Sequence, residues 1–304
     1  MLLPNINDGR FFISPILGCS GACCYCYLSL HDYTKARKNG LTVEAARKEA
    51  LKYPNFVLGE KGTIVSVGAW GDIFPLDRED LIIYSVNYIK DLLSWGNPMQ
   101  IMSKNSLKQE FVEEITSAVR YPGQLLYSTT ITTLDQWQKI EPCTSSPLER
   151  LNTCSYFRKC GIPTNVLLKP FIPQITGMEI EQISDALLKY KIDYCTVGIL
   201  YLDEKIANRI SKNPVIHDLI TDLDIETNHL DCNGNAQLNA TGIKELMTYV
   251  EYLKKKGIRA FLKSSCVNAN VLRVKNQSNY YEGHDSYCID CGNCKRNKLL
   301  EESK

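Results

Sequence analysis

The chain has 304 residues, 44% hydrophobic and 23% charged, so it falls in the range of ordinary globular proteins rather than disordered ones. Lys and Arg number 35 against 34 Asp and Glu, and the resulting net charge of +1 argues against a surface built to hold nucleic acid. No apolar run is long enough for a membrane span, and the first residues lack the basic start and apolar core of a signal peptide, so we expect a soluble, cytoplasmic protein.

Short apolar runs alternate with amphipathic stretches over most of the chain, a pattern typical of a parallel sheet with crossover helices. The expected strands cover residues 11–16, 63–67, 100–102, 125–130, 165–168 and 194–199. The expected helices cover residues 43–51, 78–93, 107–119, 147–160 and 179–189. Pro147 opens the fourth helix, where a missing N–H has no cost, and Gly161 closes it. Periodicity alone allows either a doubly wound sheet or an incomplete barrel.

The alternation of apolar runs and amphipathic stretches changes near residue 234. A helix expected over residues 240–256 and a short apolar run over 258–262 lead into a polar tail that contains cysteines. We therefore expect an α/β domain over residues 1–235, with a C-terminal helix and metal-binding tail over residues 236–304 packing on it.

The chain has 13 cysteines, which in a reducing cytosol are more often metal ligands or catalytic groups than disulfides. Cys19, Cys23 and Cys26 follow the first expected strand with the spacing C-x3-C-x2-C. Three thiolates can bind three irons of a 4Fe-4S cluster and leave the fourth iron free to bind S-adenosylmethionine (SAM). An electron passed to the sulfonium then releases a 5′-deoxyadenosyl radical. The alternative is a zinc site, but zinc prefers C-x2-C pairs with a fourth ligand nearby, and Cys24 lies outside the spacing.

The same loop, with Tyr25 before the last cysteine, resembles the C-x3-C-x-aromatic-C motif of the radical SAM superfamily. The resemblance implies that the backbone beside Tyr25 touches the adenine of SAM. It also implies a partial (β/α)6 TIM-like barrel with its chemistry at the carboxyl ends of the strands. We therefore expect this barrel with a C-terminal Cys-rich extension.

Further segments, over roughly residues 10–200, are similar to the superfamily branch that contains spore photoproduct lyase. Asp72 lies in a segment that resembles one near the SAM amino group, although no proline follows Asp72 as it does in the branch. The resemblance implies that Lys104 approaches the SAM carboxylate, a point contact that suits an ammonium, and that Ser128 contacts SAM. Glu141 and Arg150 match other landmarks of the branch.

A second cysteine group near the end of the chain has the spacing C-x2-C-x2-C and consists of Cys288, Cys291 and Cys294. A closed tetrahedral site needs a fourth ligand, for which Cys266 is the first candidate, ahead of Cys232 and His284. Zinc and an auxiliary iron–sulfur cluster suit four thiolates equally well. We expect a structural role, because the polar tail lacks the apolar surface to fold by itself.

Several residues are candidates for contact with the substrate. Cys143 lies just beyond the fourth strand and is a candidate hydrogen-atom donor, because S–H bonds are weak. Trp70 is a candidate for stacking on a flat ring. Glu226, His229 and Asp231 belong to an acidic run after the last barrel unit, where carboxylates can accept from the N–H edge of a guanine-type base. A solvated loop explains this run equally well.

Three functions compete. The first is a radical SAM lyase that fragments a small heterocycle, with queuine, trimmed to a smaller 7-deazaguanine in queuosine salvage, as the best candidate. The second is a DNA-repair lyase like spore photoproduct lyase, which requires a basic groove, whereas the basic positions here are dispersed. The third is a non-catalytic iron–sulfur electron carrier. Both enzymes would need an electron donor, such as a reductase, flavodoxin or ferredoxin.

Overall fold

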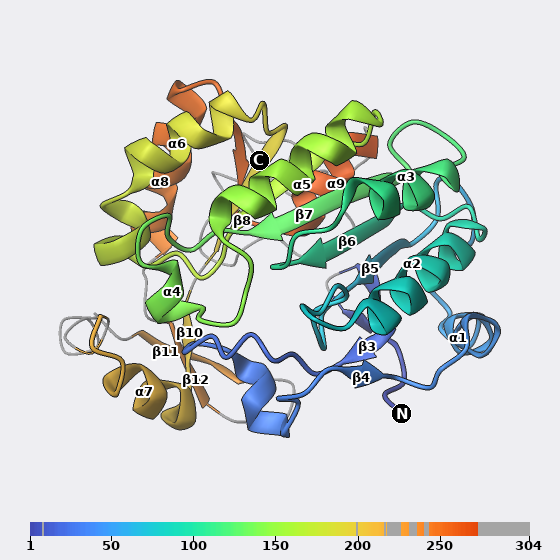
Figure 1. Ribbon diagram of the computed structural model, residues 1–304, viewed down its shortest axis with the longest axis horizontal. Helices are drawn as coiled ribbons and strands as arrows, with labels where there is room; N and C mark the ends of the chain where they lie inside the picture. Colours follow the sequence, from blue (N-terminus) through green and yellow to red (C-terminus); the bar gives the residue numbers. More distant parts are fainter. Residues whose placement is uncertain are drawn as a thin grey trace, which may run out of the picture.

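A mostly parallel eight-stranded sheet organises the chain, whose computed structural model describes residues 1–7, 9–198, 200–215, 217, 226–230, 236–239 and 243–272 (Figure 1). The sheet has the order β1-β2-β5-β6-β7-β8-β9-β13. β1 pairs antiparallel with β2, and every later neighbour is parallel. The strands are β1 Asn5–Asn7, β2 Arg10–Ile13, β5 Ile64–Val67, β6 Met99–Ser103, β7 Leu125–Thr130, β8 Thr164–Leu168, β9 Tyr194–Val197 and β13 Arg259–Phe261.

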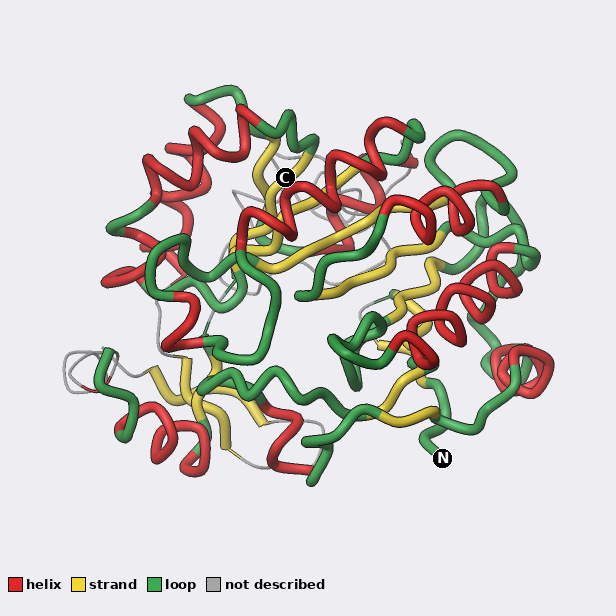
Figure 2. Tube along the Cα trace, in the orientation of Figure 1, coloured by secondary structure: helices red, strands yellow, loops and turns green. Residues whose placement is uncertain are grey.

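The helices that follow the strands pack on one face of this sheet, so that the α/β class predicted from the alternating pattern is confirmed (Figure 2). They are α1 Val43–Ala50, α2 Glu79–Leu93, α3 Gln109–Ser117, α5 Pro147–Lys159, α6 Ile180–Lys189 and α8 Ile243–Lys255. A short helix, α4 Trp137–Ile140, precedes α5. The start of α5 follows from its sequence: the Glu149 N–H donates to Ser146 Oγ at 3.3 Å, Glu149 Oε2 accepts from the Ser146 N–H at 2.7 Å, and Pro147 needs no partner.

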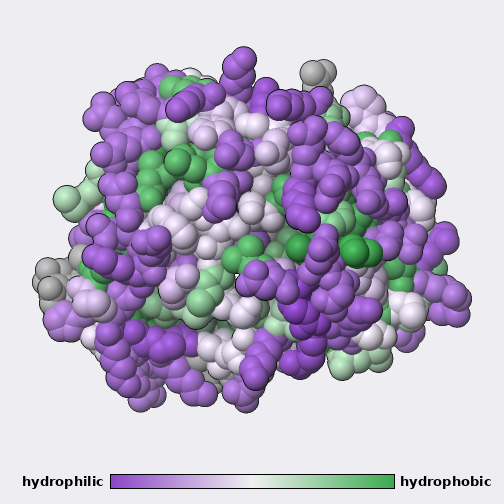
Figure 3. Space-filling model, in the orientation of Figure 1, coloured by the Kyte–Doolittle hydropathy of each residue, from purple (hydrophilic) through white to green (hydrophobic). Residues whose placement is uncertain are grey.

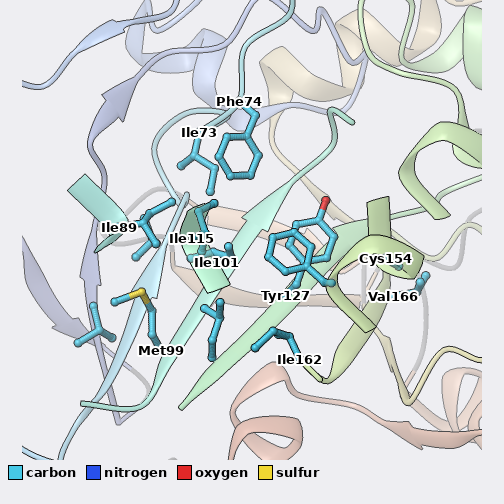
Figure 4. Packing of buried hydrophobic residues seen from close by; sticks show 14 of the residues in the cluster. Ile73, Phe74, Ile89, Met99, Ile101, Ile115, Tyr127, Cys154, Ile162 and Val166 are labelled. Carbon is cyan, nitrogen blue, oxygen red and sulfur yellow. The ribbon is translucent and has the colours of Figure 1, made fainter. Parts of the chain in front are cut away.

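The helix-covered face of the sheet is apolar. Val65, Ile101, Tyr127 and Val166 are each fully buried there, and Figure 4 shows several of these side chains in one packed layer. The Tyr127 ring stacks on Phe157 of α5 with the ring centroids 4.2 Å apart. Burial of this layer supplies the main stabilisation of the barrel wall.

The opposite face of the same strands carries buried polar groups. Gln100 Nε2 donates to Ser128 Oγ at 2.8 Å, and Asn165 Nδ2 donates to the same oxygen at 3.3 Å. Thr196 Oγ1 donates to Asn165 Oδ1 at 3.2 Å, which extends the chain of bonds to β9. Helix α9 (Ser264–Leu272) also lies on this inner face, since Asn268 Nδ2 donates to Gln100 Oε1 at 2.9 Å.

The described residues form two further, smaller sheets. β3 Ile16–Leu17 pairs with β4 Arg37–Lys38, and β10 Tyr201–Leu202 forms a three-stranded antiparallel sheet with β11 Glu226–Leu230 and β12 Ala236–Asn239. The helix α7 Glu204–Ser211 follows β10.

The structure refines the predicted strands at two places. The strand predicted over residues 11–16 divides into β2 and β3, with Ser14 and Pro15 between them, because proline has no N–H to give to a ladder. The apolar run predicted over residues 258–262 is β13, which extends the main sheet beside β9. The domain boundary at residue 235 stays a prediction.

The described surface is of an ordinary mixed kind. In the orientation of Figure 3 hydrophilic side chains cover most of the face, and hydrophobic ones form scattered patches. Among the helices of the described ranges, none combines the length and apolar character needed to cross a membrane.

Candidate functional site

The first cysteine group lies on a loop, residues 18–26, that follows β3 and is called the cysteine loop below. Backbone hydrogen bonds tie it to two segments that follow barrel strands. The Gly18 N–H donates to Trp70 O, in the loop after β5, at 2.8 Å, and the Cys24 N–H donates to Ile140 O, at the end of α4 after β7, at 3.0 Å. Gly18 has a φ of +82°, and a Cβ there would lie 2.3 Å from the Lys35 carbonyl oxygen, so only glycine is accommodated. The loop therefore stands at the carboxyl end of the barrel.

The three thiols of the predicted cluster site have different surroundings. Cys23 is buried, whereas Cys19 and Cys26 are partly exposed. Burial raises the pKa of the Cys19 thiol to about 12, and the nearby Asp72 carboxylate adds to this rise. Burial likewise raises the pKa of Cys23. Burial thus favours the neutral thiols of Cys19 and Cys23, and a coordinating metal would favour their thiolates.

Gly21 lies close to Thr144 and to the Cys19 sulfur. A Cβ on Gly21 would lie 3.0 Å from Thr144 Cγ2 and 3.2 Å from Cys19 Sγ, so a side chain at this position would enter the space beside the sulfur. The Gly21 N–H donates to Cys19 Sγ at 3.3 Å, the kind of bond that tunes cluster thiolates. Among the described residues, no three His, Cys, Asp or Glu side chains are arranged to hold a single metal ion. The donor set suits an iron–sulfur cluster, and its role as ligand stays a prediction.

Asp72 joins the loop after β5 to the end of β6. Its Oδ1 accepts from Ser103 Oγ at 2.6 Å and from the Phe74 N–H at 3.0 Å, and its Oδ2 accepts from the Lys104 N–H at 2.8 Å. Burial raises the pKa of this carboxyl group, and these hydrogen bonds oppose the rise. Asp72 therefore fixes the rim beside Cys19, and its predicted contact with the SAM amino group is untested.

A buried network of charges centres on Glu141. The Lys104 ammonium donates to Glu141 Oε1 at 2.9 Å and to the Tyr25 hydroxyl at 2.5 Å, and the Tyr25 hydroxyl also bonds Glu141. On the other side, Arg150 Nη1 lies 2.6 Å from Glu141 Oε2. Arg150 has no exposed surface and donates further to the carbonyls of Ser145 and Thr130, each at 2.8 Å.

This network sets the charge states of its members. Burial opposes the ionisation of Glu141, but Lys104 and Arg150 hold the pKa of its carboxyl group well below the usual range. Burial would lower the pKa of Lys104, yet the Glu141 carboxylate and Cys23 together hold it above its usual value. A charged Lys104 thus stands beside the cysteine loop, where the resemblance placed a lysine for the SAM carboxylate.

The remaining predicted site residues fall at the same end of the barrel or outside the description. Cys143 is exposed. It lies beside the cysteine loop, since its N–H donates to Gly21 O at 3.2 Å. Trp70 follows β5 and makes edge contacts with the rings of Tyr27, His31 and Tyr33, at centroid distances of 6.0, 5.4 and 6.2 Å.

Ser128 is fully buried on the inner face, below this rim. Sequence reasoning missed its partners Gln100 and Asn165, although an amide at the start of a predicted buried strand is a readable signal. Tyr127, next to Ser128 in sequence, lies in the apolar layer instead, because successive side chains of a strand point to opposite faces.

The predicted acidic substrate mouth and second metal site lie mostly outside the described residues. Glu226 and His229 belong to β11 and only their backbone is described, while Asp231 lies outside. Cys266 lies in the first turn of α9, and its expected partners Cys288, Cys291 and Cys294 lie outside the described residues. The second metal site stays a prediction.

The fold is that of the radical SAM enzymes. SuiB from Streptococcus suis bound to SAM superposes with a TM-score of 0.51 over 92% of this chain and 56% of that one, at 14% identity. The radical SAM methyltransferase TsrM from Kitasatospora setae gives a TM-score of 0.54 over 97% of this chain and 62% of that one, at 11% identity. The predicted partial barrel of this superfamily is confirmed.

Within this class, spore photoproduct lyase is a structural neighbour. Its complex with dinucleoside spore photoproduct superposes with a TM-score of 0.64 over 85% of this chain and 79% of that one, at 17% identity. The predicted resemblance to this branch is therefore confirmed at the level of the fold, and the expectation that the chain is an enzyme stays a prediction.

Sequence relatives add no named activity. Uncharacterized proteins from Mycobacterium bovis and Mycobacterium tuberculosis are each 24% identical over 188 residues, which is 57% of this chain. The match covers 54% of those relatives, so the chain spans about half the length of the curated proteins that it matches. No protein-family model matches the chain.

Proposed function

We propose that the protein is a radical SAM lyase of the cytoplasm that binds a 4Fe-4S cluster through Cys19, Cys23 and Cys26. The observation that carries the proposal is the position of these thiols at the carboxyl end of a parallel barrel, beside the charged Lys104 and the buried Glu141. When bound, the cluster and SAM supply reductive cleavage of the sulfonium and a carbon radical that takes hydrogen from the substrate.

The chain's own residues orient the cofactors. Lys104 presents an ammonium for the SAM carboxylate, and Glu141 with Tyr25 holds that ammonium in place. Asp72 fixes the backbone at Lys104 by accepting its N–H, so the lysine starts from a rigid position. Such preorganisation matters because a misplacement of about 1 Å costs roughly a hundredfold in rate.

The proposed substrate is a small heterocycle of the 7-deazaguanine type, with queuine as the candidate. Trp70 is half-buried near the cysteine loop and offers an aromatic surface, and the near-zero net charge suits a ligand without phosphates. Cys143 is exposed beside the same loop, where a thiol can return a hydrogen atom to a product radical. A reductase, flavodoxin or ferredoxin would deliver the electron.

A second candidate is a lesion-specific DNA lyase, favoured by the superposition on spore photoproduct lyase. That function requires contacts to phosphates, which make the affinity depend on salt. Filter binding of single- and double-stranded DNA at two salt concentrations tests this candidate. Retention that falls steeply with salt supports the DNA lyase, and no retention at low salt rejects it.

Anaerobic reconstitution with iron and sulfide, followed by SAM and a reductant, tests the radical chemistry. We expect the wild-type protein to turn brown and to form 5′-deoxyadenosine, and the Cys19→Ala variant to do neither. The matched control is Cys24→Ala, which removes a neighbouring thiol outside the ligand spacing. A colourless wild-type protein, or product formation by Cys19→Ala, rejects the proposal, and a non-catalytic electron carrier would turn brown without forming product.

Thermal unfolding with SAM and queuine tests the substrate separately. A ligand that binds only the folded state at about 100 times its Kd stabilises it by about 2.7 kcal/mol. We expect queuine to raise the Tm of the reconstituted wild-type protein and to do so less in Trp70→Leu. No shift with queuine in a protein that cleaves SAM rejects this substrate and leaves the radical chemistry in place.

A further inference from the structure

A small cap packs against the cysteine loop, and we define it as β10, α7, β11 and β12. Figure 1 shows α7 and these strands beside the short helix η1 (Tyr27–His31) that follows the loop. Asp203 caps α7 by accepting the Ile206 N–H at 2.8 Å. Ile206 and Ile210 lie one turn apart and are buried in a second hydrophobic cluster.

Part of the cysteine loop packs against that second cluster. Cys24 and Tyr25 pack against its buried residues, which include Ile140 and Ile172 from the barrel rim. The end of α7 is also tied to the rim, because Asn213 Nδ2 donates to the Lys139 carbonyl at 2.8 Å. The cap therefore covers one side of the loop with apolar groups, where charges interact more strongly than in water.

One charged side chain of the cap reaches the predicted ligand segment. Arg209 Nη2 donates to the backbone carbonyl of Cys26 at 2.5 Å. Within the described part of the chain, its buried Nε has no hydrogen-bond partner and no carboxylate pairs with this guanidinium. By contrast, Lys104 and Arg150 share the Glu141 carboxylate. The positive charge of Arg209 is thus uncompensated in the described part of the site.

We propose that Arg209 is a positioning residue that clamps the cysteine loop at Cys26 and, by its charge, favours the reduced state of the bound cluster. This inference rests on the proposed function. One-electron reduction adds a negative charge to the cluster, and a nearby cation stabilises the more negative state. Net charge and hydrogen bonding are among the factors that set the potentials of iron–sulfur clusters.

The midpoint potential of the reconstituted cluster, titrated anaerobically and followed by EPR, measures this effect without any turnover. We expect Arg209→Gln to lower the ratio of reduced to oxidised cluster at a fixed potential by about tenfold, which is a midpoint about 59 mV lower for one electron. Arg209→Lys keeps the charge and should restore the wild-type potential. The matched control is Lys205→Gln, which removes an exposed cation one turn earlier on the same helix and should change nothing.

The outcomes separate the two proposals. A wild-type protein that takes up no iron rejects the proposed function itself. A cluster of full iron content with an unshifted potential in Arg209→Gln, or an equal shift in Lys205→Gln, overturns the role of the Arg209 charge. If Arg209→Gln loses its iron, Arg209→Lys decides: wild-type potential supports the inference, whereas loss of iron there too leaves only a mechanical role and overturns the claim about charge.

Discussion

The two faces of the main sheet have opposite chemistry although they alternate along the same strands. On β6 and β7, Ile101 and Tyr127 lie in the apolar layer under the helices, while Gln100 and Ser128 form a buried polar chain on the other face. Side chains in an apolar layer need only fit together in volume and shape. Buried polar groups generally also need hydrogen-bond partners.

This difference between the two faces indicates which residues stabilise the fold and which serve the site. Buried polar chains contribute less to stability than apolar packing of the same area, and each unsatisfied member has a cost. The rim that carries the cysteine loop and Glu141 lies beyond the carboxyl ends of the same strands, where Lys104 at the end of β6 donates to Glu141. We therefore expect substitutions on the outer face to change stability alone, and those on the inner face and rim to change ligand binding as well.

The largest effect is expected at the rim. Glu141→Gln leaves the buried Arg150 and Lys104 without a carboxylate, and breaking a buried pair costs about 3–5 kcal/mol. Urea unfolding of the protein without cofactors measures this loss. The control is Glu60→Gln, an exposed carboxylate, which should change the unfolding free energy by less than about 0.5 kcal/mol. A loss of similar size at both positions would contradict the buried network.

The pH dependence of unfolding, compared between the wild type and Glu141→Gln, tests the charge state of Glu141. The pKa of Glu141 in the folded protein lies below its ordinary value of 4.5, so its contribution to stability is complete above about pH 4.5 and is lost as the pH falls through the folded value. The gap in unfolding free energy between wild type and Glu141→Gln should therefore narrow as the pH is lowered below this point. A gap that widens in acid would mean that Glu141 is protonated in the native state.

The outer face is tested by Ile101→Ala, which should lower the unfolding free energy by about 3 kcal/mol because it opens a cavity in a fully buried layer. Its counterpart is Ser66→Ala on the adjacent strand β5. The Ser66 hydroxyl is buried and has no hydrogen-bond partner among the described residues, so its removal should be nearly neutral. Equal losses of unfolding free energy in Ile101→Ala and Ser66→Ala would contradict the expected difference in stability between apolar and polar buried positions.

The inner face is tested at Ser128, and its neighbour Thr129, whose side chain points to the other face, serves as the control. Ser128→Ala removes the acceptor of Gln100 Nε2 and Asn165 Nδ2, which should cost about 2 kcal/mol, and it should also weaken SAM binding. Thr129→Val removes the bond from Thr129 Oγ1 to the Ser103 carbonyl, 2.8 Å long, and should cost about 1 kcal/mol. Calorimetric titration with SAM distinguishes the two variants, and unchanged binding in both would remove Ser128 from the site.

The smallest effect is expected far from both faces, at the start of α1. Thr42 Oγ1 accepts the Ala45 N–H at 3.1 Å, and Thr42→Ala should lower the unfolding free energy by about 1 kcal/mol. Iron content and SAM cleavage should stay at wild-type values. A change in either would show that stability and function are not separated as the two faces suggest.

Local signals predicted most of the barrel. The apolar runs at β7 and β8 and the start of α5 at Pro147 follow from alternation and capping chemistry, which neighbouring residues encode. The division at Pro15 was missed because the apolar run continues across it. The seventh parallel strand, β13, was predicted only as a short run, because three residues carry no periodic pattern.

The candidate site was predicted only in part. Spacing alone selected Cys19, Cys23 and Cys26, because the ligands of one cluster lie on one short loop. Gln100 and Arg209 were missed, since their roles depend on partners far away in sequence, at Ser128 and Cys26.

The sequence by itself determined the alternating strands and helices, the cysteine spacing and the residue types at the rim, because each of these depends on neighbours along the chain. Only the tertiary structure decided that one buried carboxylate, Glu141, holds both Lys104 and Arg150, and that α7 brings Arg209 to the cysteine loop. Pairing between distant segments is set by how the barrel closes and packs, and closure is a property of the whole chain rather than of any single stretch.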